Sequence, residues 1–136
     1  MKRIKVPTSL ALVLVFAVGC GATTKSTIPY HEEAMRGTDD AIVYIFRQED
    51  LVGSVGPFNV HVDGKIVGAL KQSAYMPVHV LPGIHSVQIG EPCSPEEFKT
   101  RAGETYYILS KGAYMSFLSK DQALPILQTM KYDMGN

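Results

Sequence analysis

The sequence predicts a mainly β protein, an antiparallel β-sandwich of about seven strands with one short C-terminal helix. Three observations lead to this fold class. From about residue 40, runs of β-branched and aromatic residues are separated by turn residues about every eight to twelve positions. The pair Asp63-Gly64 stands between two of these runs, as in a tight β-hairpin. Helical spacing of apolar residues follows Ser119.

The first two predicted strands differ in how their side chains alternate. Residues 41–47 (AIVYIFR) are apolar on both faces, which predicts a strand in the middle of a sheet. Residues 58–62 (FNVHV) alternate between apolar and polar side chains, which predicts a strand with one buried face. The glycines and the proline between these two runs predict a loop.

The Asp63-Gly64 pair predicts a type I′ turn, because both central residues of that turn need a positive φ. In the simplest hairpin register, Val60 faces Val67 and Leu70 points to solvent. A bulge at Gly68 would turn Leu70 back toward the core, which is a common use of glycine within a strand.

The remaining elements follow from short apolar runs and the turn residues between them. Further strands are expected at residues 74–81, 84–89, 96–101, 105–110 and 113–118. Ser119 with Gln122 three residues later forms a capping box, which predicts a helix start. Pro125 lies past the first turn, so this helix should be short or kinked.

The N-terminus has the pattern of a targeting segment. Positive residues precede an apolar run of nine residues at positions 10–18, which is too short for a membrane-spanning helix. The run ends in Ala17-Val18-Gly19-Cys20. This end resembles the lipobox of bacterial lipoproteins, which implies cleavage before Cys20 and lipid attachment to its sulfur. The predicted organisation is a signal peptide at residues 1–19, lipidated Cys20 with a flexible tether at 20–39, and a β-sandwich at 40–136.

Composition narrows the possible partners. The 136 residues include 13 Lys+Arg and 13 Asp+Glu, so the formal net charge is zero and nothing favours nucleic-acid binding. Removal of the signal peptide would take three basic residues with it, so the mature chain carries no polybasic membrane surface. Membrane attachment is therefore expected through the lipid on Cys20. The resemblance to lipoproteins implies the periplasmic face of the outer membrane, because no Asp follows Cys20.

Three segments together resemble a known family. They are Val-x-Val-Asp-Gly-Lys-x-Val-Gly at residues 60–68, Leu-Pro-Gly-x-His-x-Val at 81–87 and Ala-Gly-Glu-Thr-Tyr-Tyr at 102–107. This series is similar to a family of small bacterial envelope lipoproteins with a domain of unknown function, and to PEGA-type surface modules. The resemblance implies a transthyretin-like (prealbumin-like) β-sandwich in the cell envelope, with no established activity.

The histidines give little support for a metal site. The four histidines are His31, His61, His79 and His85. His31 falls in the predicted tether, and strand alternation places His61 and His79 on polar faces. There they are expected to be solvated, and the less favoured alternative is a metal site completed by a carboxylate. His85 shares its predicted face with Val87 and Ile89, so a half-buried core histidine is expected.

Cys93 is the remaining thiol once Cys20 is assigned to the lipid. An inert loop cysteine is expected, and an intermolecular disulfide is the alternative. A nucleophile needs a base or a cation beside it. The neighbours Glu91, Glu96 and Glu97 instead disfavour a thiolate.

Several tyrosines lie on predicted strands and allow two interpretations. They are Tyr44, Tyr75, Tyr106, Tyr107 and Tyr114. An exposed strip of tyrosines would stack on sugars or peptides. Packing in the core and across strands is the favoured interpretation.

Function is expected to be non-catalytic. The sequence contains no Gly-x-Ser-x-Gly, phosphate-loop or dinucleotide motif, and we assign no catalytic, cofactor or metal residues. The prediction is an envelope lipoprotein that contacts another envelope protein or a cell-wall component. The alternatives are a carrier of a small ligand and, less favoured, an enzyme with a site built from loops.

Overall fold

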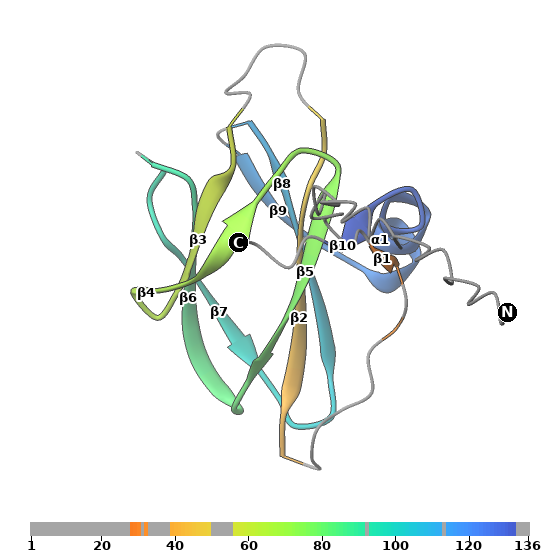
Figure 1. Cartoon of the computed structure of the whole chain (residues 1–136). Helices are drawn as coiled ribbons and strands as arrows, with labels where there is room; N and C mark the ends of the chain where they lie inside the picture. The colour runs from red at the N-terminus through yellow and green to blue at the C-terminus, as the bar shows by residue number, and fades with distance from the viewer. Residues whose placement is uncertain are drawn as a thin grey trace, which may run out of the picture.

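The fold class is confirmed: the protein is a mainly β sandwich of two sheets with one short helix (Figure 1). A computed structural model describes residues 28–30, 32, 39–49, 56–91, 93–112 and 114–132. The six-stranded sheet has the spatial order β1 (Ile28–Pro29), β10 (Lys131–Tyr132), β5 (Ala74–Val80), β2 (Ala41–Arg47), β8 (Thr105–Lys111) and β9 (Tyr114–Leu118). The four-stranded sheet has the order β4 (Lys65–Leu70), β3 (Phe58–Val62), β6 (Gly83–Ile89) and β7 (Glu96–Thr100).

The strand directions correct one part of the prediction. β2 runs antiparallel to β5 but parallel to β8, and β10 runs parallel to β5. An even number of chain reversals separates β2 from β8, so the chain returns to the first sheet in its original direction. The six-stranded sheet is therefore mixed, whereas every pair in the four-stranded sheet is antiparallel.

The hairpin between β3 and β4 confirms the predicted turn, and it contains a bulge one residue before Gly68, where the bulge was predicted. Asp63 and Gly64 have φ values of 52° and 75°, as a type I′ turn requires. Val60 pairs with Gly68 and not with Val67, because the register shifts by one residue at this point. Val67 is the extra residue, and Leu70 is consequently fully buried.

Two buried layers lie on the two faces of the six-stranded sheet. The inner layer, between the sheets, consists of Val43, Ile45, Val60, Val62, Leu70, Ala74, Met76, Val87, Ile89 and Ile108. The outer layer, on the opposite face, consists of Ile42, Tyr44, Phe46, Tyr75, Tyr107, Ala123, Leu127 and Met130. Strand β2 contributes to both layers, because its side chains alternate between the faces. Each fully buried side chain of this size stabilises the fold by about 1.5–3 kcal/mol relative to exposure.

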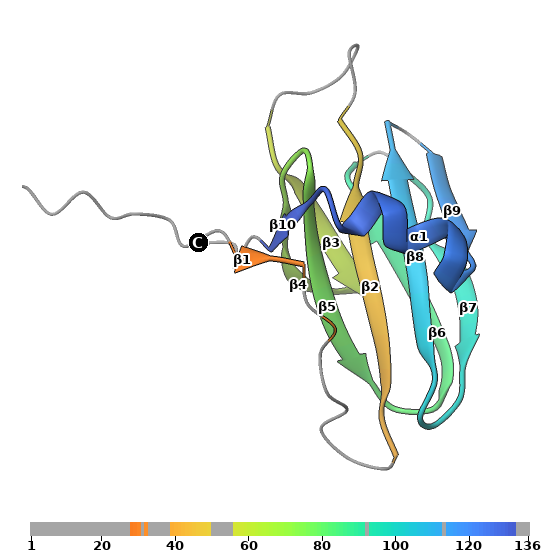
Figure 2. The ribbon, with the colours of Figure 1, turned by 90° about the vertical axis from the view of Figure 1, so that its right-hand side faces the viewer.

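Helix α1 (Lys120–Leu127) covers the outer layer by crossing β8 and β2 (Figure 2). It begins with the predicted capping box. The Ser119 side chain accepts a hydrogen bond from the Gln122 backbone N–H, and the Gln122 side chain accepts one from the Ser119 backbone N–H. Pro125 lies inside the helix, which is only eight residues long. The prediction of a short helix is therefore confirmed.

The folded domain begins earlier than residue 40. Strand β1 pairs with β10, and the ring of Tyr30 packs edge-on against Tyr44 and Tyr75 at centroid distances of 5.5 and 5.3 Å. Glu32 accepts a hydrogen bond from Lys120 on α1 at 3.0 Å. The predicted tether over residues 20–39 is therefore too long, since residues 28–32 include parts of the domain. Sequence patterns missed β1 and β10 because two residues are too short to show alternation.

Candidate functional site

The predicted lipidation site, Cys20, lies outside the described residues, as does the predicted signal peptide at 1–19. His31 also lies outside them. Within the part of the chain that the structure describes, no helix is long and apolar enough to cross a membrane. The lipid anchor on Cys20 thus stays a prediction from sequence.

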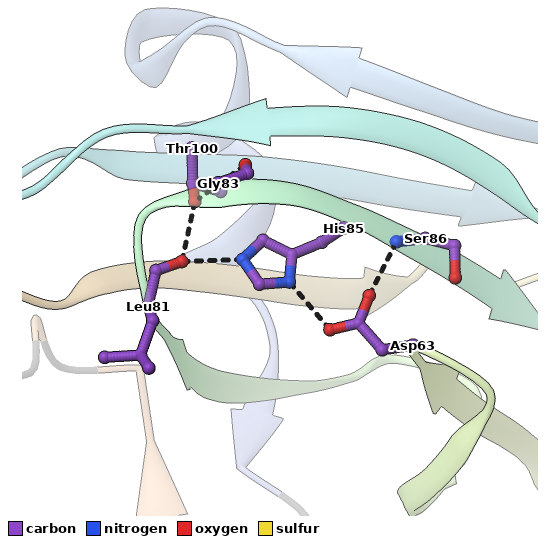
Figure 3. A network of polar contacts seen from close by, with 6 residues as sticks. All are labelled: Asp63, Leu81, Gly83, His85, Ser86 and Thr100. Atoms are coloured by element: carbon purple, nitrogen blue, oxygen red, sulfur yellow. Dashed lines mark hydrogen bonds and ion pairs between the residues drawn. The ribbon is translucent and has the colours of Figure 1, made fainter.

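The best-defined polar site in the described residues is a network around His85 on β6 (Figure 3). The ring Nδ1 lies 2.7 Å from Asp63 Oδ2, in the turn between β3 and β4. The ring Nε2 lies 2.6 Å from the carbonyl oxygen of Leu81, in the turn between β5 and β6. Asp63 Oδ1 also accepts the backbone N–H of Ser86 at 2.9 Å, and the Thr100 hydroxyl donates to the Leu81 carbonyl at 3.1 Å. These bonds join two turns to β6 and β7.

Both ring nitrogens of His85 face oxygen acceptors, so both must donate a proton to satisfy the geometry. That condition is met by the imidazolium form. Burial acts to lower the pKa of His85, but the hydrogen bonds to Asp63 and Leu81 outweigh it, and the pKa is raised above its ordinary value. The same bond from His85, followed by the bond from the Ser86 N–H, lowers the pKa of Asp63.

An Asp-His pair is also part of many hydrolase sites, where the second ring nitrogen contacts a nucleophile. In this protein that nitrogen donates to the main-chain carbonyl of Leu81. The ring additionally packs against Phe98, with centroids 5.9 Å apart. The arrangement therefore holds two turns together, and we call Asp63, His85 and the Leu81 carbonyl the histidine clamp.

The prediction of a half-buried His85 is confirmed, since 13% of its side chain is exposed. Sequence reasoning did not find its partner Asp63, which is 22 residues away. The available signal was the Asp63-Gly64 turn itself. A hairpin turn beside the next strand of the same sheet presents its aspartate to that strand, but this is visible only once the strand order is known.

His61 and His79 do not meet, so the alternative of a shared metal site is wrong for this pair. His61 lies on β3 beside the core residues Val60 and Val62, which face the inner layer, so it points out of the four-stranded sheet. His79 lies on β5, on the outer face of the six-stranded sheet, with its Nδ1 3.2 Å from Asp40 Oδ2. No group of three or more His, Cys, Asp or Glu residues suited to a metal ion occurs among the described residues.

Cys93 lies partly buried in the loop between β6 and β7, and its carbonyl accepts a hydrogen bond from the Gln88 side chain at 2.8 Å. Among the described residues, Cys93 forms no disulfide. The loop position agrees with the sequence prediction.

Four of the five tyrosines are buried or partly buried, as the packing interpretation predicted, with one exception. Tyr44 and Tyr107 stack at 5.7 Å and 9° between ring planes, and both lie in the outer layer with Tyr75. Tyr114 is the exception, because 80% of it is exposed. Tyr106 takes another position and donates its hydroxyl proton to Glu104 at 2.6 Å.

Two hydroxyls of the tyrosine cluster are buried without a hydrogen-bond partner among the described residues, those of Tyr30 and Tyr107. Burial is the main cause of the raised pKa of both phenols. The neutral phenol is therefore the stable form in this layer.

The last residue of β2 is a buried arginine that closes one end of the inner layer. Strand patterns in the sequence marked it only as the end of a strand. Arg47 is fully buried, and its guanidinium lies over the ring of Phe58 at 3.6 Å. Its Nη1 donates to the Gly56 carbonyl at 2.8 Å. These contacts join β2 to the start of β3.

Comparison with known proteins adds no functional information. No protein-family model matches the chain, and neither a curated protein nor a solved structure matches it. Function must therefore be inferred from the residues and the geometry described above.

Proposed function

We propose that this chain is a lipid-anchored protein of the bacterial cell envelope, with a non-catalytic β-sandwich that binds another envelope protein or a cell-wall component. The observation that carries the proposal is the order of features at the N-terminus. Positive residues, nine apolar residues and small residues directly before Cys20 follow one another as in lipoprotein signals. The lipid would hold the protein at the periplasmic face of the outer membrane.

The short distance in sequence between Cys20 and the fold supports a role at the membrane surface. The first described strand begins at Ile28, eight residues after Cys20. A fully extended chain covers about 3.5 Å per residue, so this segment spans at most about 28 Å. The β-sandwich would therefore remain near the bilayer, where it can contact molecules bound to the same membrane or lying directly beneath it.

The polar sites favour a binding role over catalysis. The second ring nitrogen of His85, which a hydrolase would direct at a nucleophile, donates to the Leu81 carbonyl. His61 and His79 lie on different sheets and point away from each other. General acid-base catalysis needs such groups within hydrogen-bond reach of one another or of a substrate.

The lipid anchor can be tested by metabolic labelling with a fatty acid. We expect the full-length chain and its Cys93→Ser variant to incorporate label, and the Cys20→Ser variant to incorporate none, because the Cys20 sulfur is the acylated atom. Membrane fractionation should find the full-length chain and the Cys93→Ser variant with the membranes, and the Cys20→Ser variant without membrane attachment through a lipid. Label retained by the Cys20→Ser protein contradicts the proposal.

The binding role can be tested by cross-linking the full-length chain in intact cells, followed by mass spectrometry. We expect one envelope component to be captured repeatedly by the anchored protein and far less by the Cys20→Ser variant, which lacks the anchor. Equal capture by both proteins would show that the membrane position is irrelevant to binding.

A further inference from the structure

The two sheets present four outer strands, and three of them have features that discourage pairing with another chain. Strand β1 has only two residues, β4 carries a bulge at Val67, and β7 has charged side chains at Glu96, Glu97 and Lys99. Short length, bulges and charge are the usual means by which proteins protect sheet edges.

Strand β9 (Tyr114–Leu118) has none of these features. Its sequence, YMSFL, contains no charged residue, proline or glycine, and its pairing with β8 is continuous over all five residues. Among the described strands, β9 has a neighbour on one side only. Its other side therefore presents backbone N–H and C=O groups that can pair with a further strand.

The apolar side chains of β9 are also incompletely covered. The side chain of Phe117 points toward the inner layer, and its ring centroid lies 5.7 Å from that of Phe98 on β7. Nevertheless, 44% of Phe117 is exposed. Tyr114 lies on the opposite face of the strand with 80% exposed. Large apolar side chains on both faces of an unprotected edge indicate a surface that another strand would cover.

We propose that β9 pairs with β9 of a second copy of this chain, antiparallel and centred on Ser116, so that the six-stranded sheet continues across a twofold axis. The sequence of β9 fits itself in this register. Met115 then lies opposite Phe117 of the second copy on the inner face, and Tyr114 lies opposite Leu118 on the outer face. A twofold contact requires this kind of self-complementary surface.

The neighbouring edge of the other sheet is compatible with the same symmetry. Strand β7 lies beside β9 through the contact between Phe98 and Phe117. An antiparallel approach of two β7 strands about Phe98 sets Glu97 of one copy against Lys99 of the other, which are opposite charges. The β7 edge therefore does not repel a second copy of this chain, and the self-complementary register of β9 favours a second copy over an unrelated strand.

Cross-linking through single cysteines tests the contact in the full-length chain, with Cys93→Ser as background. In the proposed register the two Ser116 positions are directly opposed, with Cβ atoms about 4.5–5.5 Å apart. The two Tyr114 positions are offset by four residues, or about 13 Å along the strand. A short bis-maleimide should therefore join two Ser116→Cys chains in cells but not two Tyr114→Cys chains.

A matched control is Asn59→Cys, which is exposed on β3, a strand paired on both sides. We expect Ser116→Cys to give at least about ten times more cross-linked dimer than Asn59→Cys or Tyr114→Cys, which corresponds to about 1.4 kcal/mol. Adding Tyr114→Lys to the Ser116→Cys chain should remove most of the dimer by placing a charge on the edge, whereas adding Asn59→Lys should leave the yield unchanged. Thermal melts establish that each variant is folded.

Three results would overturn the proposal. The first is a Ser116→Cys yield no higher than that of Asn59→Cys. The second is a dimer that persists with Tyr114→Lys, which would place the contact elsewhere. The third is an adduct of Ser116→Cys with a different protein in place of a second copy, which would make β9 a site for a heterologous strand.

Discussion

The two buried layers on either side of the six-stranded sheet are built from different kinds of side chain. The inner layer is almost entirely aliphatic, whereas the outer layer is dominated by Tyr44, Tyr75 and Tyr107 beneath α1. Neighbouring residues of β2 separate into the two layers: Ile45 points inward and Tyr44 points outward, and both are fully buried. One strand thus serves two cores with different chemistry.

The two layers also differ in the polar atoms that they bury. Tyrosine brings a large apolar ring and a hydroxyl into the outer layer, and two of these hydroxyls, on Tyr30 and Tyr107, have no partner among the described residues. At the margin of the inner layer, both ring nitrogens of His85 are hydrogen-bonded. The outer layer therefore buries phenol hydroxyls, whereas the margin of the inner layer holds a charge between two hydrogen-bond acceptors.

The largest expected effect tests whether the outer layer is a true core. Ile45→Ala should lower the free energy of unfolding by about 2–5 kcal/mol, because it leaves a cavity between the sheets. Tyr44→Ala should cost a comparable amount, about 3–5 kcal/mol, if α1 and Tyr30 seal the outer layer as tightly. Urea unfolding of both variants measures this comparison.

The exposed residue Ile84 of β6, of which 72% is exposed, supplies the control for the same measurement. Ile84→Ala should change the free energy of unfolding by less than about 0.5 kcal/mol, as surface substitutions usually do. A Tyr44→Ala effect as small as that of Ile84→Ala would mean that the outer layer is only a loose cover.

These layers show how far the sequence predicts the fold. The run at residues 41–47 is apolar on both faces, which correctly predicted a central strand covered on both sides. It did not predict that α1 and residues 28–30 cover the outer layer. Both segments are distant from the run in sequence and pack against it only in the folded chain. The bulge near Gly68 was predictable because Leu70 had no other way to be buried.

The second prediction concerns the charge held at the margin of the inner layer. The raised pKa of His85 means that its contribution to stability is full below its unfolded pKa of about 6.5 and is lost as pH rises through the folded value. The lowered pKa of Asp63 means that its contribution is present above the unfolded value and is lost as pH falls through the folded value. The clamp should therefore be strongest between the unfolded pKa of Asp63, about 3.9, and the unfolded pKa of His85, about 6.5.

Replacement of His85 by Gln should remove this pH dependence. We expect a loss of about 1 kcal/mol at pH 6, where the imidazolium is favoured, and a smaller loss at pH 9; Asp63 is partly exposed, so solvent screens the pair. Urea unfolding across this range checks the difference between the two proteins. His61→Gln serves as the control, and a pH-independent difference for His85→Gln would show that the ring is neutral throughout.

The histidine clamp also shows what sequence could not provide about the site. Alternation along residues 84–89 placed His85 on the face of Val87 and correctly predicted partial burial. Its partner is set by the order β4-β3-β6-β7, which places the Asp63 turn next to β6. Alternation put His61 and His79 on polar faces, where we expected both to be solvated. The structure differs, because only 12% of the His79 side chain is exposed and Nδ1 of His61 is buried. Alternation also could not assign the two histidines to different sheets.

The third prediction returns to the hydroxyls of the outer layer. Tyr107→Phe removes a buried hydroxyl that has no partner among the described residues, so the free energy of unfolding should stay the same or rise by up to about 1 kcal/mol. Tyr106→Phe is the matched control, because its hydroxyl donates to Glu104 and bonds the Arg101 N–H. A clear loss of stability in Tyr107→Phe would reveal an ordered water bound to that hydroxyl.

The smallest expected effect tests whether residues 28–32 belong to the outer layer in solution. Glu32 and Lys120 form an ion pair at 3.0 Å that joins this segment to α1, and both side chains are more than half exposed. A double-mutant cycle of Glu32→Gln and Lys120→Met should give a small but measurable coupling energy, because solvent screens exposed pairs. The same hydrogen bond raises the pKa of Lys120, so the coupling should be constant at neutral pH and shrink as salt is added.

The exposed pair Arg101 and Glu104, which joins neighbouring positions of one turn, provides a local reference. A coupling of zero for Glu32 and Lys120, with the reference pair measurable, would mean that the segment before β2 is not held against α1 and that the outer layer is closed by the helix alone.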